Sequence, residues 1–126
     1  MRLLLDSQAV LMTMSPAAAL SNRVRAALLD PANTVFVSAA TPYELEWKKA
    51  IGKLSFPDVA DWSRAMSAAG YQELTIALAH SERAARLPKH HRDPWDRILI
   101  AQALVENLTL VSGDRRIAAY GAPMLW

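Results

Sequence analysis

Four acidic residues stand at breaks in the sequence pattern, where an apolar run ends or a helix is expected to begin. They are Asp6, Glu44, Asp96 and Asp114. If the fold gathers them, four carboxylates would repel one another and raise some of their pKa values unless a divalent cation neutralised them. Ligands that are all oxygen suit Mg²⁺ or Mn²⁺ rather than zinc. Such an ion can align a water molecule and stabilise the charge that develops when a phosphodiester is cleaved, so the acids favour metal-dependent phosphate chemistry.

Glu44 and Asp114 also have an ordinary structural explanation as partners of a helix. Thr41 and Glu44 form a capping-box pattern, and Glu44 can pair with Lys48 four residues later. Asp114 precedes two arginines and is placed to cap a short helix. The expected apolar stripe of the helix that carries Glu44 comprises Tyr43, Trp47, Ala50 and Ile51. Glu44 lies beside this stripe rather than opposite it, so its carboxylate can still border a cleft.

The stretch HRDPWDR places Asp93 and Asp96 three residues apart, on either side of a proline. Asp93 before Pro94 is a good helix N-cap, and Asp96 in the first turn is favoured by the helix dipole. Capping therefore explains this stretch at least as well as a metal site does. Asp6 is harder to explain in this way, because a carboxylate that ends a leucine run must be solvated or paired at the edge of the core.

Basic residues are interleaved with these acids in the C-terminal half. We expect Arg97, Arg115 and Arg116 to hold the phosphate backbone of a nucleic acid. The formal net charge of +2 is compatible with a polyanionic partner but is weak support for one. His90 and His91 are expected in structural or surface roles, because neighbours in a loop usually point apart.

Strands alternate with helices along the chain. Strands are expected at residues 2–5, 34–38, 71–76 and 108–111, with a last apolar piece at 123–126. Helices are expected at residues 16–29, 41–52, 57–69, 77–87 and 94–106, with a helical turn at 115–120. This alternation predicts a three-layer α/β/α domain with a central, mainly parallel sheet of four to five strands. Ligands of such sheets bind at the carboxyl ends of strands where the strand order reverses, and Asp6, Glu44 and Asp114 follow strands.

Length and composition narrow the class of protein. A chain of 126 residues can bury one core, so we expect a single domain over residues 1–126. The absence of cysteine fits a reducing compartment and excludes thiolate chemistry and zinc–cysteine sites. The N-terminal apolar run is far shorter than the roughly 20 residues of a membrane span, so we expect a cytoplasmic protein without membrane association. Neither a glycine-rich phosphate loop nor a G-x-S-x-G elbow occurs.

Three segments together resemble the PIN-domain family, and within it the VapC-like toxin ribonucleases of bacterial type II toxin–antitoxin systems. They are LLLDSQAVL, SAATPYELEWKKAIGKL and HHRDPWDRILIAQALVENLTLVSGDRRIAAYG, and the resemblance that they carry extends over nearly the whole chain. The last segment is quite specific, whereas the first alone is weak. Ser7 keeps the hydroxyl that is common in the family, but Gln8 stands where Asn or His is usual and Ser112 where Thr is frequent. None of these departures removes a carboxylate.

The resemblance implies hydrolysis of RNA that depends on Mg²⁺ or Mn²⁺. The metal-binding and catalytic acids it implies are Asp6, Glu44, Asp96 and Asp114. Asp93, Ser7 and Ser112 then support these ligands without binding the ion. The resemblance also implies that a small cognate antitoxin protein binds and inhibits the chain, and that the chain forms a homodimer.

Two other functions stay open at this stage. One is a catalytically inactive PIN-like binding or interaction module. The complete set of four acids favours the enzyme over this module, because a degenerate module would be free to lose any of them. The other is a different Mg²⁺-dependent phosphotransfer protein, such as a receiver or phosphatase domain. It ranks low because Asp6-Ser7-Gln8 lacks the second acid of a D-x-D phosphatase motif.

Overall fold

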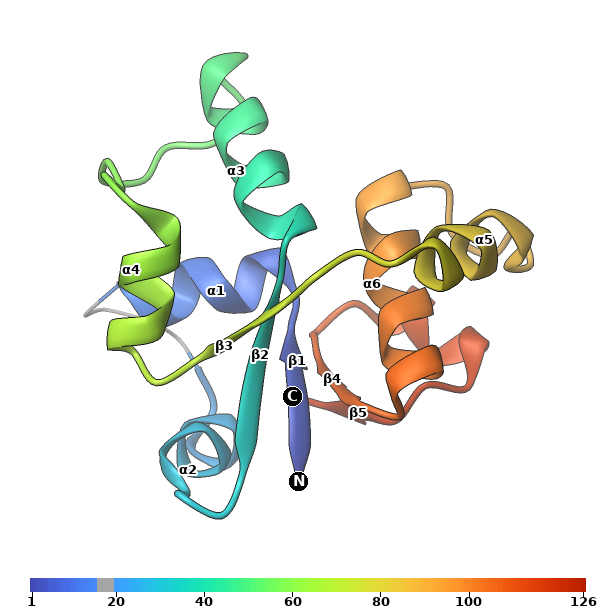
Figure 1. Cartoon of the computed structure of the whole chain (residues 1–126), viewed down its shortest axis with the longest axis horizontal. Coiled ribbons are helices and arrows are strands. Elements are labelled where there is room, and N and C mark those ends of the chain that lie inside the picture. Colours follow the sequence, from blue (N-terminus) through green and yellow to red (C-terminus); the bar gives the residue numbers. More distant parts are fainter. Residues whose placement is uncertain (16–19) are drawn as a thin grey trace.

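A parallel sheet forms the centre of the fold. The computed structural model of the chain, shown in Figure 1, describes residues 1–15 and 20–126. Its strands are β1 (Arg2–Leu5), β2 (Thr34–Ser38), β3 (Gln72–Leu74), β4 (Thr109–Val111) and β5 (Met124–Leu125). These five strands pair in parallel in the order β3-β2-β1-β4-β5, which confirms the predicted sheet. The order reverses between β1 and β4, so the carboxyl ends of these two strands are where a ligand is expected.

Helices cover both faces of the sheet and give the predicted α/β/α layers. They are α1 (Ser7–Met14), α2 (Asn22–Leu29), α3 (Ala40–Ala50), α4 (Trp62–Ala68), α5 (Leu78–Arg86), α6 (Pro94–Glu106) and the 3-10 helix η1 (Arg115–Tyr120). In Figure 1, α1, α2 and α4 lie on one side of the sheet, and α5 and α6 lie on the other. Among the described residues, no helix is both long enough and apolar enough to cross a membrane.

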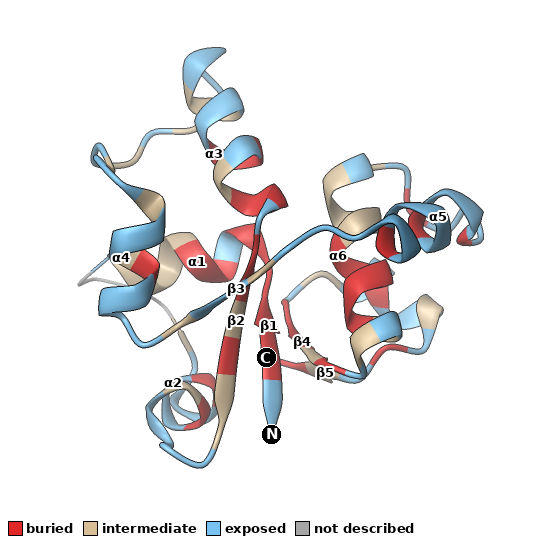
Figure 2. Cartoon of the chain, in the orientation of Figure 1, coloured by how far each residue is buried: buried red, intermediate tan, exposed pale blue. Residues whose placement is uncertain are grey.

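The central strand β1 is buried on both faces. Leu3 and Leu5 pack into one apolar cluster with residues of α1, α2, α3 and α4, whereas Leu4 packs into a second cluster with residues of α5, α6 and η1. All three leucines are fully buried, and the buried colouring of β1 in Figure 2 shows the same pattern. A strand that is covered on both faces has a continuous run of apolar residues rather than alternating apolar and polar residues. The sequence RLLL therefore predicts a strand of this kind.

The first helices differ from the sequence prediction. Helix α1 follows Asp6 directly and was not expected, and it ends at Ser15. The helix predicted at 16–29 is confirmed only over α2, and residues 16–19 at its predicted start lie outside the described residues. Ser21 caps α2, because its hydroxyl accepts a hydrogen bond from the Val24 N–H at 3.1 Å.

Helix α4 is shorter than the predicted 57–69. It begins after Asp61, whose carboxylate accepts a hydrogen bond from the Arg64 N–H at 3.0 Å. The preceding residues do not continue this helix. Instead, the Lys49 ammonium contacts the Phe56 carbonyl at 2.8 Å and the Asp58 carboxylate at 2.5 Å, which ties this connection to α3.

Arg97 joins the start of α6 to the end of α5. Its guanidinium donates to the carbonyl oxygens of Ala84, Leu87, Pro88 and His91, at 2.8, 2.8, 2.9 and 3.1 Å. The last carbonyls of a helix have no intrahelical partner and carry partial negative charge, so an arginine at the end of α5 satisfies and stabilises them. This arrangement fixes the turn of residues 87–93, which leads into α6.

We predict that Arg97→Lys lowers the free energy of unfolding by about 2–3 kcal/mol, because one ammonium cannot replace a planar fork that serves four carbonyls. Urea unfolding followed by circular dichroism measures the change. Arg92→Lys is the matched control, because Arg92 is exposed, and it should stay within about 0.5 kcal/mol of the wild type. Equal stability of the two variants would contradict the role given to Arg97.

Candidate functional site

One cavity at the carboxyl ends of β1 and β4 is lined by all four acids selected from the sequence. It has a volume of about 390 Å³, and its lining includes Asp6, Glu44, Asp96, Asp114, Ser7 and Lys48. Asp6 follows β1 and Asp114 lies three residues beyond β4, whereas Asp96 comes from the first turn of α6 and Glu44 from the second turn of α3. The cavity therefore lies where the sheet topology predicts a ligand site.

Asp6 joins the end of β1 to the start of α1. Its carboxylate caps α1 by accepting a hydrogen bond from the Ala9 N–H at 2.7 Å. Its own N–H donates to the Val111 carbonyl of β4 at 3.1 Å. Burial raises the pKa of the Asp6 carboxyl, although hydrogen bonds from Ser112 and Ala9 oppose the rise. Ionisation of the Asp6 carboxyl is therefore unfavourable unless a cation lies nearby.

Glu44 is buried and held by two side chains. The Ser7 hydroxyl donates to Oε1 and the Lys48 ammonium contacts Oε2, both at 2.5 Å. The pairing with Lys48 predicted from the sequence is confirmed. The predicted capping box is wrong: α3 begins at Ala40, no side chain caps it, and Thr41 lies inside its first turn.

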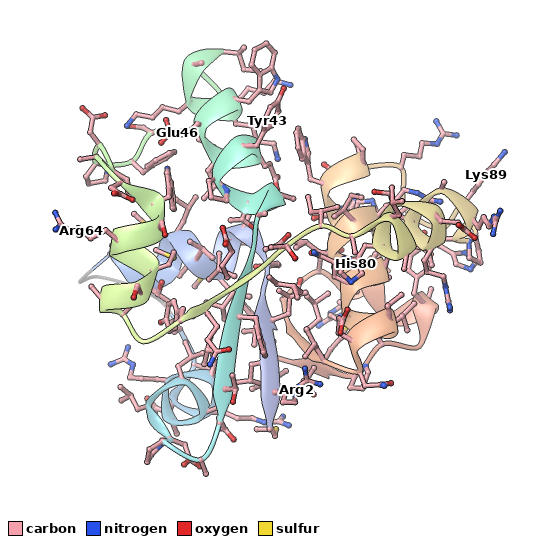
Figure 3. The ribbon with its side chains drawn as sticks, in the orientation of Figure 1. Arg2, Tyr43, Glu46, Arg64, His80 and Lys89 are labelled. Atoms are coloured by element: carbon pink, nitrogen blue, oxygen red, sulfur yellow. The ribbon has the colours of Figure 1, made fainter. Side chains whose placement is uncertain are left out.

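The apolar stripe predicted for α3 is also wrong. Tyr43, Trp47 and Ile51 are exposed, with Tyr43 at 64% and Trp47 at 52%, whereas Glu44 and Leu45 are buried. The Tyr43 ring instead lies 4.9 Å from the Trp95 ring of α6, on the side of α3 that faces α6 in Figure 3. The helix is thus rotated so that Glu44 points inward to the cavity.

Asp93 and Asp96 have separate tasks at the start of α6. The Asp93 carboxylate accepts hydrogen bonds from the N–H groups of Trp95 and Asp96, at 2.9 and 3.1 Å, so its predicted capping role is confirmed. Asp96 is left to face the cavity. Burial raises the pKa of Asp96 to about 6, and the charges of Asp93, Glu44 and Asp6 act in the same direction, while His91 opposes them.

Asp114 caps η1 and is the best compensated of the four acids. Its carboxylate accepts a hydrogen bond from the Arg116 backbone N–H at 3.0 Å, and the Arg116 guanidinium contacts both oxygens, with Nε 3.0 Å from Oδ1 and Nη2 2.8 Å from Oδ2. Hydrogen bonds from Arg116 hold the pKa of Asp114 well below its usual range. Ser112 holds the segment that carries Asp114, because its hydroxyl accepts a hydrogen bond from the Asp114 N–H at 3.1 Å.

The three arginines expected to bind phosphate have different surroundings. Arg97 is engaged with backbone carbonyls, which is a structural task that the sequence did not indicate. Arg116 is exposed and paired with Asp114, and Arg115 is exposed beside it. Of the three, Arg116 is thus the one whose guanidinium contacts an acid of the cavity.

His91 is a residue of the site that sequence reasoning missed. It was expected in a structural or surface role, but it is buried, and its Nε2 lies 2.9 Å from Asp96 Oδ2 and 3.2 Å from Asp114 Oδ2. No spacing in the sequence indicates these contacts, because they form only when η1 packs against the turn before α6. Lys48 was recognised as a partner of Glu44, but its place in the cavity wall was not.

We predict that Asp96→Asn stabilises the metal-free protein at neutral pH. The folded pKa of Asp96 is raised from 3.8 to about 6, so wild-type stability falls as pH rises between these values and levels off above them. The neutral variant avoids this loss. It should be more stable at pH 7.5 by roughly 1–2 kcal/mol after allowance for solvent screening, and the difference should vanish near pH 4.

Urea unfolding in EDTA at several pH values measures this difference. Glu73→Gln, which neutralises an exposed carboxylate on β3, is the control and should show no comparable pH-dependent gain. A stability difference between Asp96→Asn and wild type that does not change with pH would contradict the raised pKa.

Comparisons with known proteins agree with this fold. The model of the PIN domain family matches residues 3–123. A VapBC2 structure from Rickettsia felis, bound to a DNA fragment from its promoter, has a TM-score of 0.63 and 13% identity, and covers 100% of this chain and 98% of that one. FitAcB from Neisseria gonorrhoeae has a TM-score of 0.65 and 19% identity, with coverages of 98% and 96%.

A toxin–antitoxin complex from Klebsiella pneumoniae has a TM-score of 0.63 and 18% identity, and covers 98% of this chain and 95% of that one. The comparison with curated proteins gave no significant match. At these identities the solved structures show a shared fold, and the family model extends over almost the whole sequence. The chain therefore belongs to the PIN-domain family.

Proposed function

We propose that this protein is a metal-dependent endoribonuclease that acts as the toxin of a type II toxin–antitoxin pair. The observation that carries the proposal is the convergence of Asp6, Glu44, Asp96 and Asp114 on one cavity at the point where the strand order reverses. PIN-domain proteins are generally nucleases, and the similar solved structures named above include toxin–antitoxin complexes. RNA as the substrate comes from the family resemblance.

The four carboxylates fit Mg²⁺ or Mn²⁺. They offer only oxygen ligands, which these ions prefer, and they line a single cavity. The raised pKa values of Asp6 and Asp96 support the fit, because they reflect negative charge that the surrounding protein does not fully compensate. A bound ion would supply a Lewis acid that activates water and offsets the charge developing on the phosphate.

The residues around the acids have supporting tasks in this proposal. Ser7 and Lys48 hold the Glu44 carboxylate in one orientation, and Ser112 holds the segment that carries Asp114. Arg115 and Arg116 lie exposed beside Asp114, where they would contact the phosphates of RNA. Arg97 supports the scaffold of α6 rather than the substrate.

The proposal includes a small antitoxin protein as the inhibiting partner, a homodimeric toxin and a cytoplasmic location. The first is supported by likeness to complexes in which a toxin is bound to its antitoxin. A small antitoxin-like reading frame next to the gene, whose product abolishes the ribonuclease activity on mixing, would support it. Sedimentation of the purified protein would test the homodimer.

We predict that Asp6→Asn lowers RNA cleavage in Mn²⁺ or Mg²⁺ by more than about 100-fold, since even residues that only support metal ligands contribute 10–100-fold. Purified protein without antitoxin is incubated with RNA, with and without EDTA. Asp58→Asn is the matched control, because Asp58 is exposed and makes a surface ion pair with Lys49 that contributes little.

Cleavage that persists in EDTA, or that is unchanged in Asp6→Asn, would reject this mechanism. Mn²⁺ binding without any cleavage by the wild type would instead favour a catalytically inactive PIN-like binding module.

A further inference from the structure

His91 is held rigidly between the two elements that carry Asp96 and Asp114. It is only 4% exposed. Its N–H donates to the Tyr120 hydroxyl of η1 at 2.7 Å, and its carbonyl accepts from the Arg97 guanidinium of α6 at 3.1 Å. The Tyr120 hydroxyl in turn donates to the Pro88 carbonyl at 2.8 Å. The backbone of His91 is therefore held by contacts with η1 and α6 that do not involve the carboxylates.

The hydrogen bonds of the ring indicate which nitrogen carries the proton. The Asp93 N–H donates to Nδ1 at 3.2 Å. A nitrogen that accepts a hydrogen bond has no proton of its own, so the neutral imidazole carries its proton on Nε2. Nε2 faces Asp114 Oδ2 at 3.2 Å and lies 2.9 Å from Asp96 Oδ2. His91 thus presents a proton, and not a lone pair, to Asp114, and Asp96 Oδ2 lies beside the same nitrogen.

The same three side chains are close enough to be mistaken for a metal centre. One ligand atom from each of His91, Asp96 and Asp114 lies within 4.8 Å of the others. A histidine that binds a metal must offer a lone pair. Here the lone pair of Nδ1 is used by the Asp93 N–H, and Nε2 carries the proton. The imidazole therefore has the chemistry of a hydrogen-bond donor to Asp114, not that of a ligand to the ion.

We propose that His91 is a positioning residue: its Nε2–H donates a hydrogen bond to Asp114 and lies beside an oxygen of Asp96, and it thereby sets the spacing of these two acids without binding the metal. The inference rests on the metal site proposed above. Asp96 lies in the first turn of α6 and Asp114 caps η1, so the chain between them comprises most of α6 and all of β4. One buried nitrogen near an oxygen of each acid provides the missing link. Arg116 holds Asp114 from the exposed side, and His91 holds it from the buried side.

The tautomer can be tested without any variant. Long-range ¹H–¹⁵N NMR of the metal-free protein at pH 7.5 distinguishes the protonated from the bare ring nitrogen of each histidine. We expect His91 to show a bare Nδ1 and a protonated Nε2. A proton on Nδ1, with Nε2 bare, would overturn the proposal.

Metal affinity provides the second test. His91→Phe keeps a ring but removes the donor, and we expect it to weaken Mn²⁺ binding by about 10–100-fold in isothermal titration calorimetry. His91→Gln keeps a donor and should recover part of that loss. His90→Phe is the matched control, because His90 is exposed and packs edge-on against the Tyr120 ring, and its Mn²⁺ affinity should be unchanged. Thermal unfolding in EDTA checks that each variant folds.

Pulsed electron paramagnetic resonance of the Mn²⁺-loaded wild type tests whether the His91 imidazole binds the ion directly or only donates a hydrogen bond to a carboxylate. A directly bound imidazole would give a nitrogen coupling, and we expect none. Such a coupling, or an affinity in His91→Phe equal to that of the wild type, would overturn the proposal.

The Mn²⁺ affinity of Asp96→Asn distinguishes failure of the inference about His91 from failure of the proposed metal site itself. If Asp96→Asn abolishes Mn²⁺ binding but His91→Phe does not weaken it, only the inference about His91 fails. If neither substitution affects binding, both the inference and the proposed metal site fail.

Discussion

Four carboxylates converge at the carboxyl ends of β1 and β4, and the chain has to offset their mutual repulsion in order to fold around them. Each acid is offset differently. Asp6 accepts a backbone N–H, Glu44 is held by a hydroxyl and an ammonium, and Asp114 is held by a guanidinium. Asp96 has the weakest compensation, since burial and neighbouring acids raise its pKa to about 6. The least compensated negative charge of the site is therefore on Asp96 and Asp6, the two acids of the cavity whose pKa values are raised by burial.

The caps of the helices explain how acids from distant parts of the chain reach the same place. In a parallel α/β fold, helices begin near the carboxyl edge of the sheet, so an aspartate that caps a helix is delivered to that edge. Asp6 caps α1 and Asp114 caps η1 while both line the cavity. In HRDPWDR, capping and lining the cavity are done by different acids: Asp93 caps α6, and the helix start that it fixes places Asp96 at the cavity. Capping and site formation are thus two results of one local structure.

The sequence predicts those parts of the fold that depend on local pattern and on burial on both faces. Strand β2 and helix α6 have the predicted bounds, and β1 is marked by its continuous apolar run. Helix α1 was missed because no break separates it from Asp6. The face of α3 was misjudged because Tyr43 and Trp47 are apolar yet exposed, while the charged Glu44 is buried. The tasks of Arg97 and His91 depend on contacts between the turn of residues 87–93 and other elements, which sequence spacing does not reveal.

The groups that contact the acids differ in how far they are buried, and therefore in whether a metal ion could displace them. The side chains of Lys48 and Arg116 are 30% and 66% exposed, so either can move toward solvent without disturbing the core. His91 has no such path, because its backbone is fixed by Tyr120 and Arg97 and its ring is buried. A divalent ion entering the cavity would therefore compete with the charges of Lys48 and Arg116 for Glu44 and Asp114. In the role proposed above, His91 would keep its contact with Asp114, so the spacing of Asp96 and Asp114 would be set before the ion arrives rather than by it.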